Sequence, residues 1–195
     1  MKIKLLVFLL LIFSLITKNS NAQNHEKVNT WANFEQFKNE NNKLSRLKNG
    51  EERVVFLGNS ITIGWQETHP EFFENKTYVN RGISGQTTPQ MLVRFYADVI
   101  DIQATTVVIL AGTNDIAGNT GPMSIDMILN NIKSMTDIAL ANNVKVILCS
   151  VLPAYDYPWS PNKNPNIKIP KLNSKIKKYA IETGVHYLDY FKALD

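Results

Sequence analysis

The 195-residue sequence has one cysteine, Cys149, so the chain can form no internal disulfide. Cys149 stands in the apolar run Val144–Val151, which favours a buried, unreactive thiol over a nucleophile. The sequence also lacks a metal-ligand cluster, a P-loop and the glycine fingerprint of dinucleotide-binding folds. We therefore expect neither a metal nor a cofactor.

No apolar run is long enough to cross a bilayer, which takes roughly 20 residues. The longest, residues 5–16, follows Lys2 and Lys4 and precedes the small-x-small sequence Ser20-Asn21-Ala22. This is the pattern of a signal peptide over residues 1–22, and an N-terminal membrane anchor is the alternative. We expect a protein exported to the periplasm or the extracellular space of a bacterium, with no integral membrane segment after cleavage.

The net charge is small, at +4, and three of these positive charges are the lysines of residues 1–22. The basic balance therefore gives no reason to expect a nucleic-acid partner. Four later lysines lie at helical spacing: Lys168, Lys171, Lys175 and Lys178. A solvated helix face explains this stripe, and binding of an anionic polysaccharide or membrane surface is the alternative.

Short β-branched runs alternate with segments of helical periodicity. The runs that predict strands are Arg53–Leu57, Thr77–Asn80, Thr106–Ala111, Val144–Val151 and Val185–Tyr190. Such alternation, with continuously apolar strands, indicates a parallel sheet covered on both faces. We expect one α/β domain over 51–195, after a helical lead-in over 23–50.

The helical segments differ in the strength of their pattern. Apolar residues recur every three or four positions in Met123–Leu140 and again in Ile169–Ala180. A leading helix is expected over Trp31–Leu47, and Thr88-Pro89 has the form of a helix N-cap followed by proline. The long stretch Pro153–Pro165, rich in proline and aromatics, predicts a functional loop.

Polar, glycine-bearing turns follow the first three predicted strands. They contain Ser60, Gly85 and Asn114, and ligands of open parallel sheets bind beyond these strand ends. Each turn alone is ordinary: a tight turn with a helix cap, a turn glycine and an Asx turn. Together they supply what acyl transfer needs, a hydroxyl nucleophile at a helix N-terminus and donors for an oxyanion: the N–H groups of Ser60 and Gly85 and the amide of Asn114.

These turns resemble a known family. The segments FLGNSIT, NRGISGQTT and LAGTND are similar, in order and spacing, to blocks I, II and III of the SGNH hydrolases, the GDSL esterase/lipase family. The resemblance implies a flavodoxin-like three-layer α/β/α sandwich with a five-stranded parallel sheet in the order 2-1-3-4-5. It makes Ser60 the nucleophile and an oxyanion donor, and Gly85 and Asn114 the other donors. Asn59 stands where the family has aspartate, a change we expect to be tolerated.

The resemblance stops before the family's fourth signature, an Asp-x-x-His sequence whose histidine activates the serine. The histidines here are His25, His69 and His186, and none has aspartate three residues before it. We therefore expect a domain that is incomplete at its C-terminus, lacks the last helix covering the sheet and is nearly inactive as given. The alternative is an evolved non-catalytic relative.

Four aromatic residues are candidates to contact substrate: Trp65, Tyr155, Tyr157 and Trp159. They could stack on sugar rings or pack the loops onto the domain. Together with the predicted export of the protein, these aromatic residues favour a serine esterase that acts on small acyl esters, such as acetyl groups on a glycan. Within the same chemistry the alternative is a lysophospholipase or thioesterase. Outside it, the alternatives are a glycan-binding module that has lost catalysis and, with less support, a flavin binder.

Overall fold

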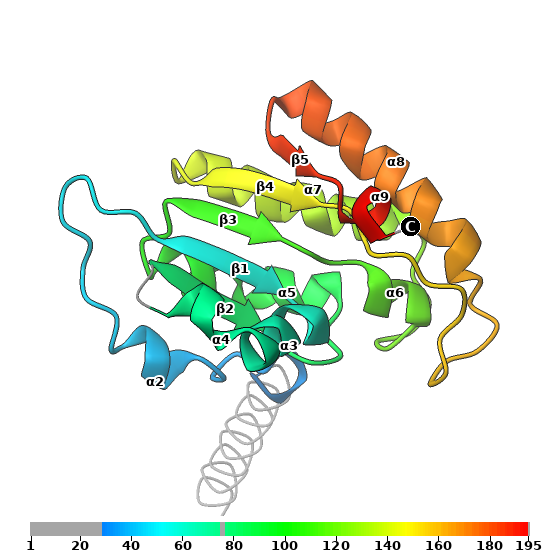
Figure 1. The fold of residues 1–195 in the computed structure, drawn as a ribbon, viewed down its shortest axis with the longest axis horizontal. Helices are drawn as coiled ribbons and strands as arrows, with labels where there is room; N and C mark the ends of the chain where they lie inside the picture. The colour runs from blue at the N-terminus through cyan, green and yellow to red at the C-terminus, as the bar shows by residue number, and fades with distance from the viewer. Residues whose placement is uncertain (1–28, 75–76, 195) are drawn as a thin grey trace, which may run out of the picture.

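The protein forms a five-stranded, all-parallel sheet in the order β2-β1-β3-β4-β5 (Figure 1). The computed structural model describes residues 29–74 and 77–194, so the signal peptide predicted over residues 1–22 lies outside the described residues. The strands are β1 (Val54–Gly58), β2 (Tyr78–Gly82), β3 (Thr106–Ile109), β4 (Lys145–Cys149) and β5 (His186–Leu188). The predicted strand order and parallel sheet are confirmed.

Helices lie on both faces of the sheet and make the molecule three-layered (Figure 1). One face is covered by α5 (Thr88–Phe95), α7 (Ile125–Ala141) and α8 (Pro165–Thr183), and α5 continues as the π-helix η1 (Tyr96–Ile100). On the other face α3 and α4 lie over β1 and β2. The helices not on the first face are α2 (Lys38–Asn41), α3 (Ser60–Thr68), α4 (Pro70–Phe73), α6 (Thr113–Ala117) and α9 (Tyr190–Leu194).

Two expectations about helices are wrong in detail. The segment 31–47 is not one helix, because turns follow residue 32, Asn33 takes a left-handed φ of 50°, and α2 has only four residues. The N-cap of α5 is Thr87 rather than Thr88, and the Gln90 side chain accepts a hydrogen bond from the Thr87 N–H at 2.9 Å. Thr88 and Pro89 therefore both lie inside the first turn.

The sheet is apolar on both faces because successive strand residues point in opposite directions. Val55 and Leu57 of β1 belong to the large core cluster shared with α5, α7 and α8. Phe56, between them, belongs to a smaller cluster with Phe73, Val108 and Cys149 on the face of α3 and α4. This explains why β1 and β3, in the middle of the sheet, do not alternate between apolar and polar residues.

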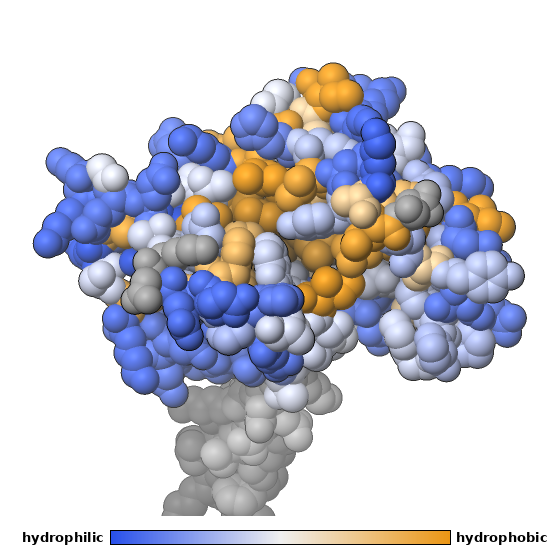
Figure 2. Space-filling model, viewed as in Figure 1, coloured by the Kyte–Doolittle hydropathy of each residue, from blue (hydrophilic) through white to orange (hydrophobic). Residues whose placement is uncertain are grey.

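One part of the α3 face is open. Within the described ranges, the five-residue α9 is the only helix beside β3 to β5 on this face (Figure 1). Apolar side chains gather in the hollow across the middle of the face (Figure 2). The cavity volume there is about 730 Å³. We call it the apolar groove.

The remaining surface features concern membranes and the lysine stripe. None of the helices in residues 29–74 and 77–194 is long and apolar enough to span a bilayer. On α8, Lys175 pairs with Asp126 of α7 at 2.9 Å and Lys178 lies 3.7 Å from Glu182. These pairs suit a solvated helix face. The domain boundaries at residues 22 and 50 stay predictions.

Candidate active site

The turns after β1, β2 and β3 meet at one edge of the sheet. The strand register pairs Gly58 with Gly82 and Leu57 with Ile109, so the three strands end level with one another. The N–H of Ile83 donates to the carbonyl of Gly58 at 3.1 Å, which ties the second turn to the first. The structure therefore brings Ser60, Gly85 and Asn114 to the same edge.

Ser60 is the first residue of α3, and the preceding residue caps this helix. The Asn59 side-chain oxygen accepts a hydrogen bond from the Ile61 N–H at 3.0 Å. An amide oxygen serves this acceptor role as well as a carboxylate oxygen does, which explains how asparagine can replace the family's aspartate. The Ser60 hydroxyl is exposed and has no hydrogen-bond partner among the residues described. It stands at the positive end of the helix dipole.

The turn after β2 depends on two glycines. A Cβ at Gly82 would lie 2.8 Å from the carbonyl oxygen of Asn59, so only glycine lets β2 end this close to the turn that carries Ser60. Gly85 has a φ of +75°, in the left-handed region, and its carbonyl accepts from the Asn119 amide at 2.9 Å. These features hold the Gly85 peptide in one orientation.

Asn114 connects the third turn to the second. Its side chain is only 4 % exposed, and its amide nitrogen donates to the carbonyl of Gln86 at 2.9 Å. An asparagine amide has two N–H bonds, so the second remains available for a ligand. The next residue, Asp115, accepts from the N–H of Thr88 at 2.9 and 3.1 Å and from its hydroxyl at 2.5 Å. Two successive residues of α6 thus fix the loop that carries Gly85.

The backbone N–H groups of Ser60 and Gly85 have no acceptor within the described parts of the chain. The components of an oxyanion hole are therefore present. They are two free backbone N–H groups, an exposed hydroxyl and a carboxamide with one spare N–H. This arrangement can stabilise the negative oxygen that forms when a nucleophile attacks an ester carbonyl.

Comparison with known proteins agrees with this geometry. The GDSL-like Lipase/Acylhydrolase family matches residues 56–195, which include all three turns. The chain belongs to this family. None of the curated proteins matches it.

Solved structures of GDSL proteins share the fold. A putative acylhydrolase from Bacteroides fragilis NCTC 9343 is 46 % identical, with a TM-score of 0.82 over 84 % of this chain and 79 % of its own. A GDSL-like lipase from Bacteroides thetaiotaomicron VPI-5482 is also 46 % identical, with a TM-score of 0.81 over 83 % and 80 %. The acetyl xylan esterase AlAXEase, at 21 % identity and a TM-score of 0.58 over 72 % and 78 %, shares the fold.

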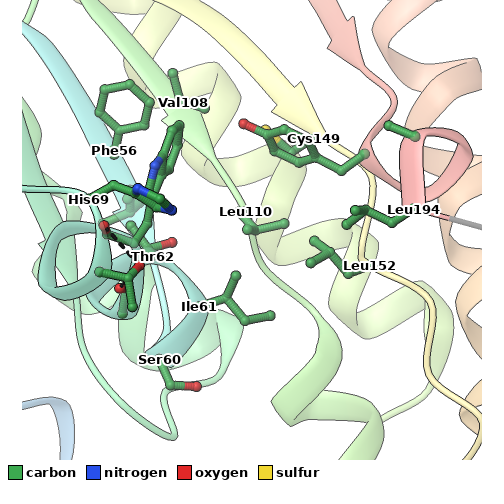
Figure 3. Close-up of a pocket in the computed structure, with 16 residues that line it drawn as sticks. Phe56, Ser60, Ile61, Thr62, His69, Val108, Leu110, Cys149, Leu152 and Leu194 are labelled. Atoms are coloured by element: carbon green, nitrogen blue, oxygen red, sulfur yellow. Dashed lines mark hydrogen bonds between the residues drawn. The ribbon is translucent and has the colours of Figure 1, made fainter. Parts of the chain in front are cut away.

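The described histidines of this GDSL protein do not reach Ser60. His69 follows α3 at the opposite end from Ser60, and nine helical residues at 1.5 Å each separate them by about 13 Å. Figure 3 shows His69 beside Phe56, at the far end of the groove from Ser60. His186 begins the edge strand β5 and is exposed. His25 lies outside the described residues. A histidine base for Ser60 would therefore have to come from outside residues 29–74 and 77–194.

The four aromatic candidates divide into two pairs. Trp65 stacks on Phe72 with ring centroids 4.3 Å apart, and Tyr157 is 2 % exposed with its hydroxyl 2.8 Å from that of Thr113. Both rings pack within the domain, and their stacking on a sugar ring stays a prediction. Tyr155 and Trp159 are 86 % and 62 % exposed, and they remain available for substrate.

The long loop of residues 150–164 is fixed to α6. Besides the Tyr157–Thr113 bond, the Ser160 hydroxyl donates to the carbonyl of Ala117 at 2.7 Å. Burial raises the pKa of Tyr157, the bond to Thr113 lowers it, and the nearby Asp115 charge raises it further. The loop therefore presents its exposed aromatics from a fixed base next to Asn114.

The apolar groove begins at Ser60 and Ile61 of α3 and faces Leu110 and Leu152 across the gap (Figure 3). Val108 and Cys149 also line it. Burial raises the pKa of the Cys149 thiol to about 12, which agrees with the unreactive role predicted for it. No group of three or more histidine, cysteine, aspartate or glutamate side chains in the described ranges could hold a metal ion.

Two charged side chains close to the site, Asp115 and Arg94, are buried although no motif in the sequence marks them as such. Burial raises the pKa of Asp115, against the lowering effect of its bonds to Thr88. The sequence does carry a signal for Arg94: it stands beside the apolar positions Met91 and Phe95 of α5, four residues before Asp98, where an ion pair can form.

Proposed function

We propose that this protein is a serine esterase in which Ser60 is the nucleophile. The N–H groups of Ser60 and Gly85 and the side-chain amide of Asn114 form the oxyanion hole. The observation that carries the proposal is the Asn114–Gln86 hydrogen bond, which holds the carboxamide next to Gly85 and leaves one amide N–H free.

In this mechanism the Ser60 oxygen attacks the carbonyl carbon of an ester. The negative charge that develops on the carbonyl oxygen is stabilised by the three donors. The alcohol leaves with a proton, the acyl group stays on Ser60, and water then releases it as the carboxylic acid. Since no described side chain activates Ser60, this chain is expected to exceed the uncatalysed rate only by the part due to binding and the hole, about 10³–10⁴-fold.

The substrate proposed is a small acyl ester, above all an acetyl ester on a carbohydrate, met by the protein after export. Tyr155 and Trp159 support this proposal because they are exposed on a loop anchored beside Asn114. Aromatic faces of this kind suit sugar rings, which are apolar on one face.

A second candidate is an esterase for longer acyl chains, of the lysophospholipase or thioesterase type. The observation that favours it is the apolar groove, which starts at Ser60 and has a volume of about 730 Å³. An acyl chain placed there would contact Ile61, Leu110 and Leu152.

The test is hydrolysis of p-nitrophenyl esters of increasing acyl length by the protein and its Ser60→Ala variant. The proposal expects a rate above background that is lost in S60A, with acetate preferred. Preference for octanoate would support the second candidate instead. Equal rates for both proteins would contradict an esterase role, and retained binding of acetylated glycans would then favour the non-catalytic alternative.

A further inference from the structure

Arg94 is a completely buried guanidinium under the proposed active site. Its side chain is 0 % exposed, and it extends from α5 toward the ends of β1 and β2. A buried charge is costly unless it is paired and hydrogen-bonded. Arg94 meets both conditions, because each of its three nitrogens donates a hydrogen bond.

The bonds of Arg94 reach both turns that carry proposed backbone donors. Nη2 donates to the carbonyl of Gly58 at 3.2 Å and to that of Arg81 at 2.9 Å. Nε donates to the side-chain oxygen of Gln86 at 2.6 Å. Gly58 lies two residues before Ser60, and Gln86 directly follows Gly85. One planar group therefore fixes the ends of β1 and β2 and the loop between β2 and α5 relative to one another.

The same network extends to the third donor. The backbone carbonyl of Gln86 accepts from the Asn114 amide, so Gln86 is bound by Arg94 through its side chain and by Asn114 through its backbone. The Gln86 amide in turn donates to the carbonyl of Ala32 at 2.7 Å. Gln86 is held from three sides, and its neighbour Gly85 is fixed with it.

The charge of Arg94 is neutralised on the side away from the site. Nη1 donates to Asp98 at 2.9 Å, and Asn41 donates to the other oxygen of Asp98 at 3.1 Å. Burial lowers the pKa of Arg94, and Asp98 raises it. Lysine could not reproduce this pattern, because its ammonium is a compact point charge whereas guanidinium is a rigid planar fork.

We propose that Arg94 is a positioning residue for the oxyanion hole, which sets the distance between the Ser60 and Gly85 N–H groups through Gly58, Arg81 and Gln86. This inference rests on the proposed function of Ser60 and Gly85. It assigns Arg94 no contact with substrate.

The test uses the chain labelled with ¹⁵N-glycine, so that the Gly85 N–H is observed directly by NMR and is assigned from its loss in Gly85→Ala. Arg94→Lys is compared with Asn131→Ala, which breaks a side-chain bond to the Thr88 hydroxyl at 3.0 Å and contacts no residue that Arg94 binds. We expect R94K to shift the Gly85 signal and N131A to leave it in place. An unchanged Gly85 signal in folded R94K would overturn the proposal.

The rate on p-nitrophenyl acetate gives an independent measurement. R94K is expected to lower kcat by up to about 10²-fold with little change in KM, as misplacement of a catalytic group does, while N131A keeps its rate below its melting temperature. If R94K does not fold, Gln86→Met replaces it and is expected to lower kcat in the same way; an unchanged kcat in folded Q86M would contradict the proposal. Failure of the proposed function is separately visible as activity retained in Ser60→Ala.

Discussion

The side-chain amide of Asn114 donates a hydrogen bond to the backbone carbonyl of Gln86 at 2.9 Å, and this bond joins the turn after β3 to the turn after β2. The two residues are 28 positions apart in the sequence. The contact places the carboxamide beside Gly85, where one amide N–H holds the loop and the other can bind an oxyanion.

Replacing Asn114 with alanine should remove both roles of this side chain. We expect N114A to lower the rate on p-nitrophenyl acetate by about 10²–10³-fold, the cost of losing one oxyanion donor. Asn131→Ala is a suitable control, because Asn131 donates to the hydroxyl of Thr88 at 3.0 Å and lies outside the proposed hole. An N114A rate within a factor of about two of the unsubstituted protein would contradict the assignment.

Tyr157 should stabilise the long loop through its hydroxyl. Tyr157→Phe removes the 2.8 Å bond to Thr113 and leaves the ring in place. The free energy of unfolding should fall by about 0.5–1.5 kcal/mol, the usual contribution of such a bond. Tyr155→Phe is the matched control, since Tyr155 is 86 % exposed, and it should be neutral in denaturant unfolding. Equal changes in the free energy of unfolding for Tyr157→Phe and Tyr155→Phe would show that the Tyr157–Thr113 hydrogen bond contributes nothing to stability.

Asp115 should make stability depend on pH in a specific direction. Burial raises its pKa above the ordinary value of 3.8, so the folded protein holds this proton to higher pH than the unfolded chain does. The contribution of Asp115 to the free energy of unfolding is therefore greatest below about pH 3.8 and is lost as the pH rises through the raised pKa. The difference in unfolding free energy between the protein and Asp115→Asn should shrink over this interval.

The measurement for Asp115 is urea unfolding at a series of pH values. Asp126→Asn, a change at an exposed aspartate, controls for the loss of one negative charge. A difference between the protein and D115N that grows with pH above 3.8 would contradict the raised pKa.

Cys149 should react with thiol reagents only after unfolding. Burial raises its pKa to about 12, so roughly one thiol in 10⁴ is ionised at pH 8, and the thiolate is the reactive form. Its 2 % exposure further restricts access, although it lines the apolar groove. The prediction is checked by measuring the rate at which Cys149 reacts with DTNB, first in native buffer and then in denaturant. Rapid stoichiometric labelling of the native protein would show that the groove opens.

The parallel sheet could be predicted from the sequence because it depends on local pattern, whereas its strand order was implied by the resemblance to the SGNH hydrolases. Continuous apolar runs such as Val54–Leu57 are characteristic of strands buried on both faces, and the ligand-binding turns of open parallel sheets follow their carboxyl ends. The glycines and Asn114 stand next to these strands, so the topology alone brings them together.

The parts that the sequence did not predict depend on contacts between distant residues. Nothing near Tyr157 indicates that its hydroxyl meets Thr113, 44 positions away, so the sequence left both loop packing and substrate stacking open for this residue. Arg94 was missed because a charged residue in an amphipathic helix is usually exposed. The expected helix over 31–47 was interrupted by the left-handed Asn33, and an asparagine does not by itself mark such a break.

The central claim is that the hydroxyl of Ser60 attacks ester carbonyls held by the neighbouring donors. The most direct measurement is mass spectrometry of the protein after incubation with p-nitrophenyl acetate, followed by peptide mapping. We predict an acetyl group on Ser60 that accumulates, because no described side chain activates water to remove it, and that is much reduced in Asn114→Ala. Acetylation confined to surface lysines, with an unmodified Ser60, would contradict the account.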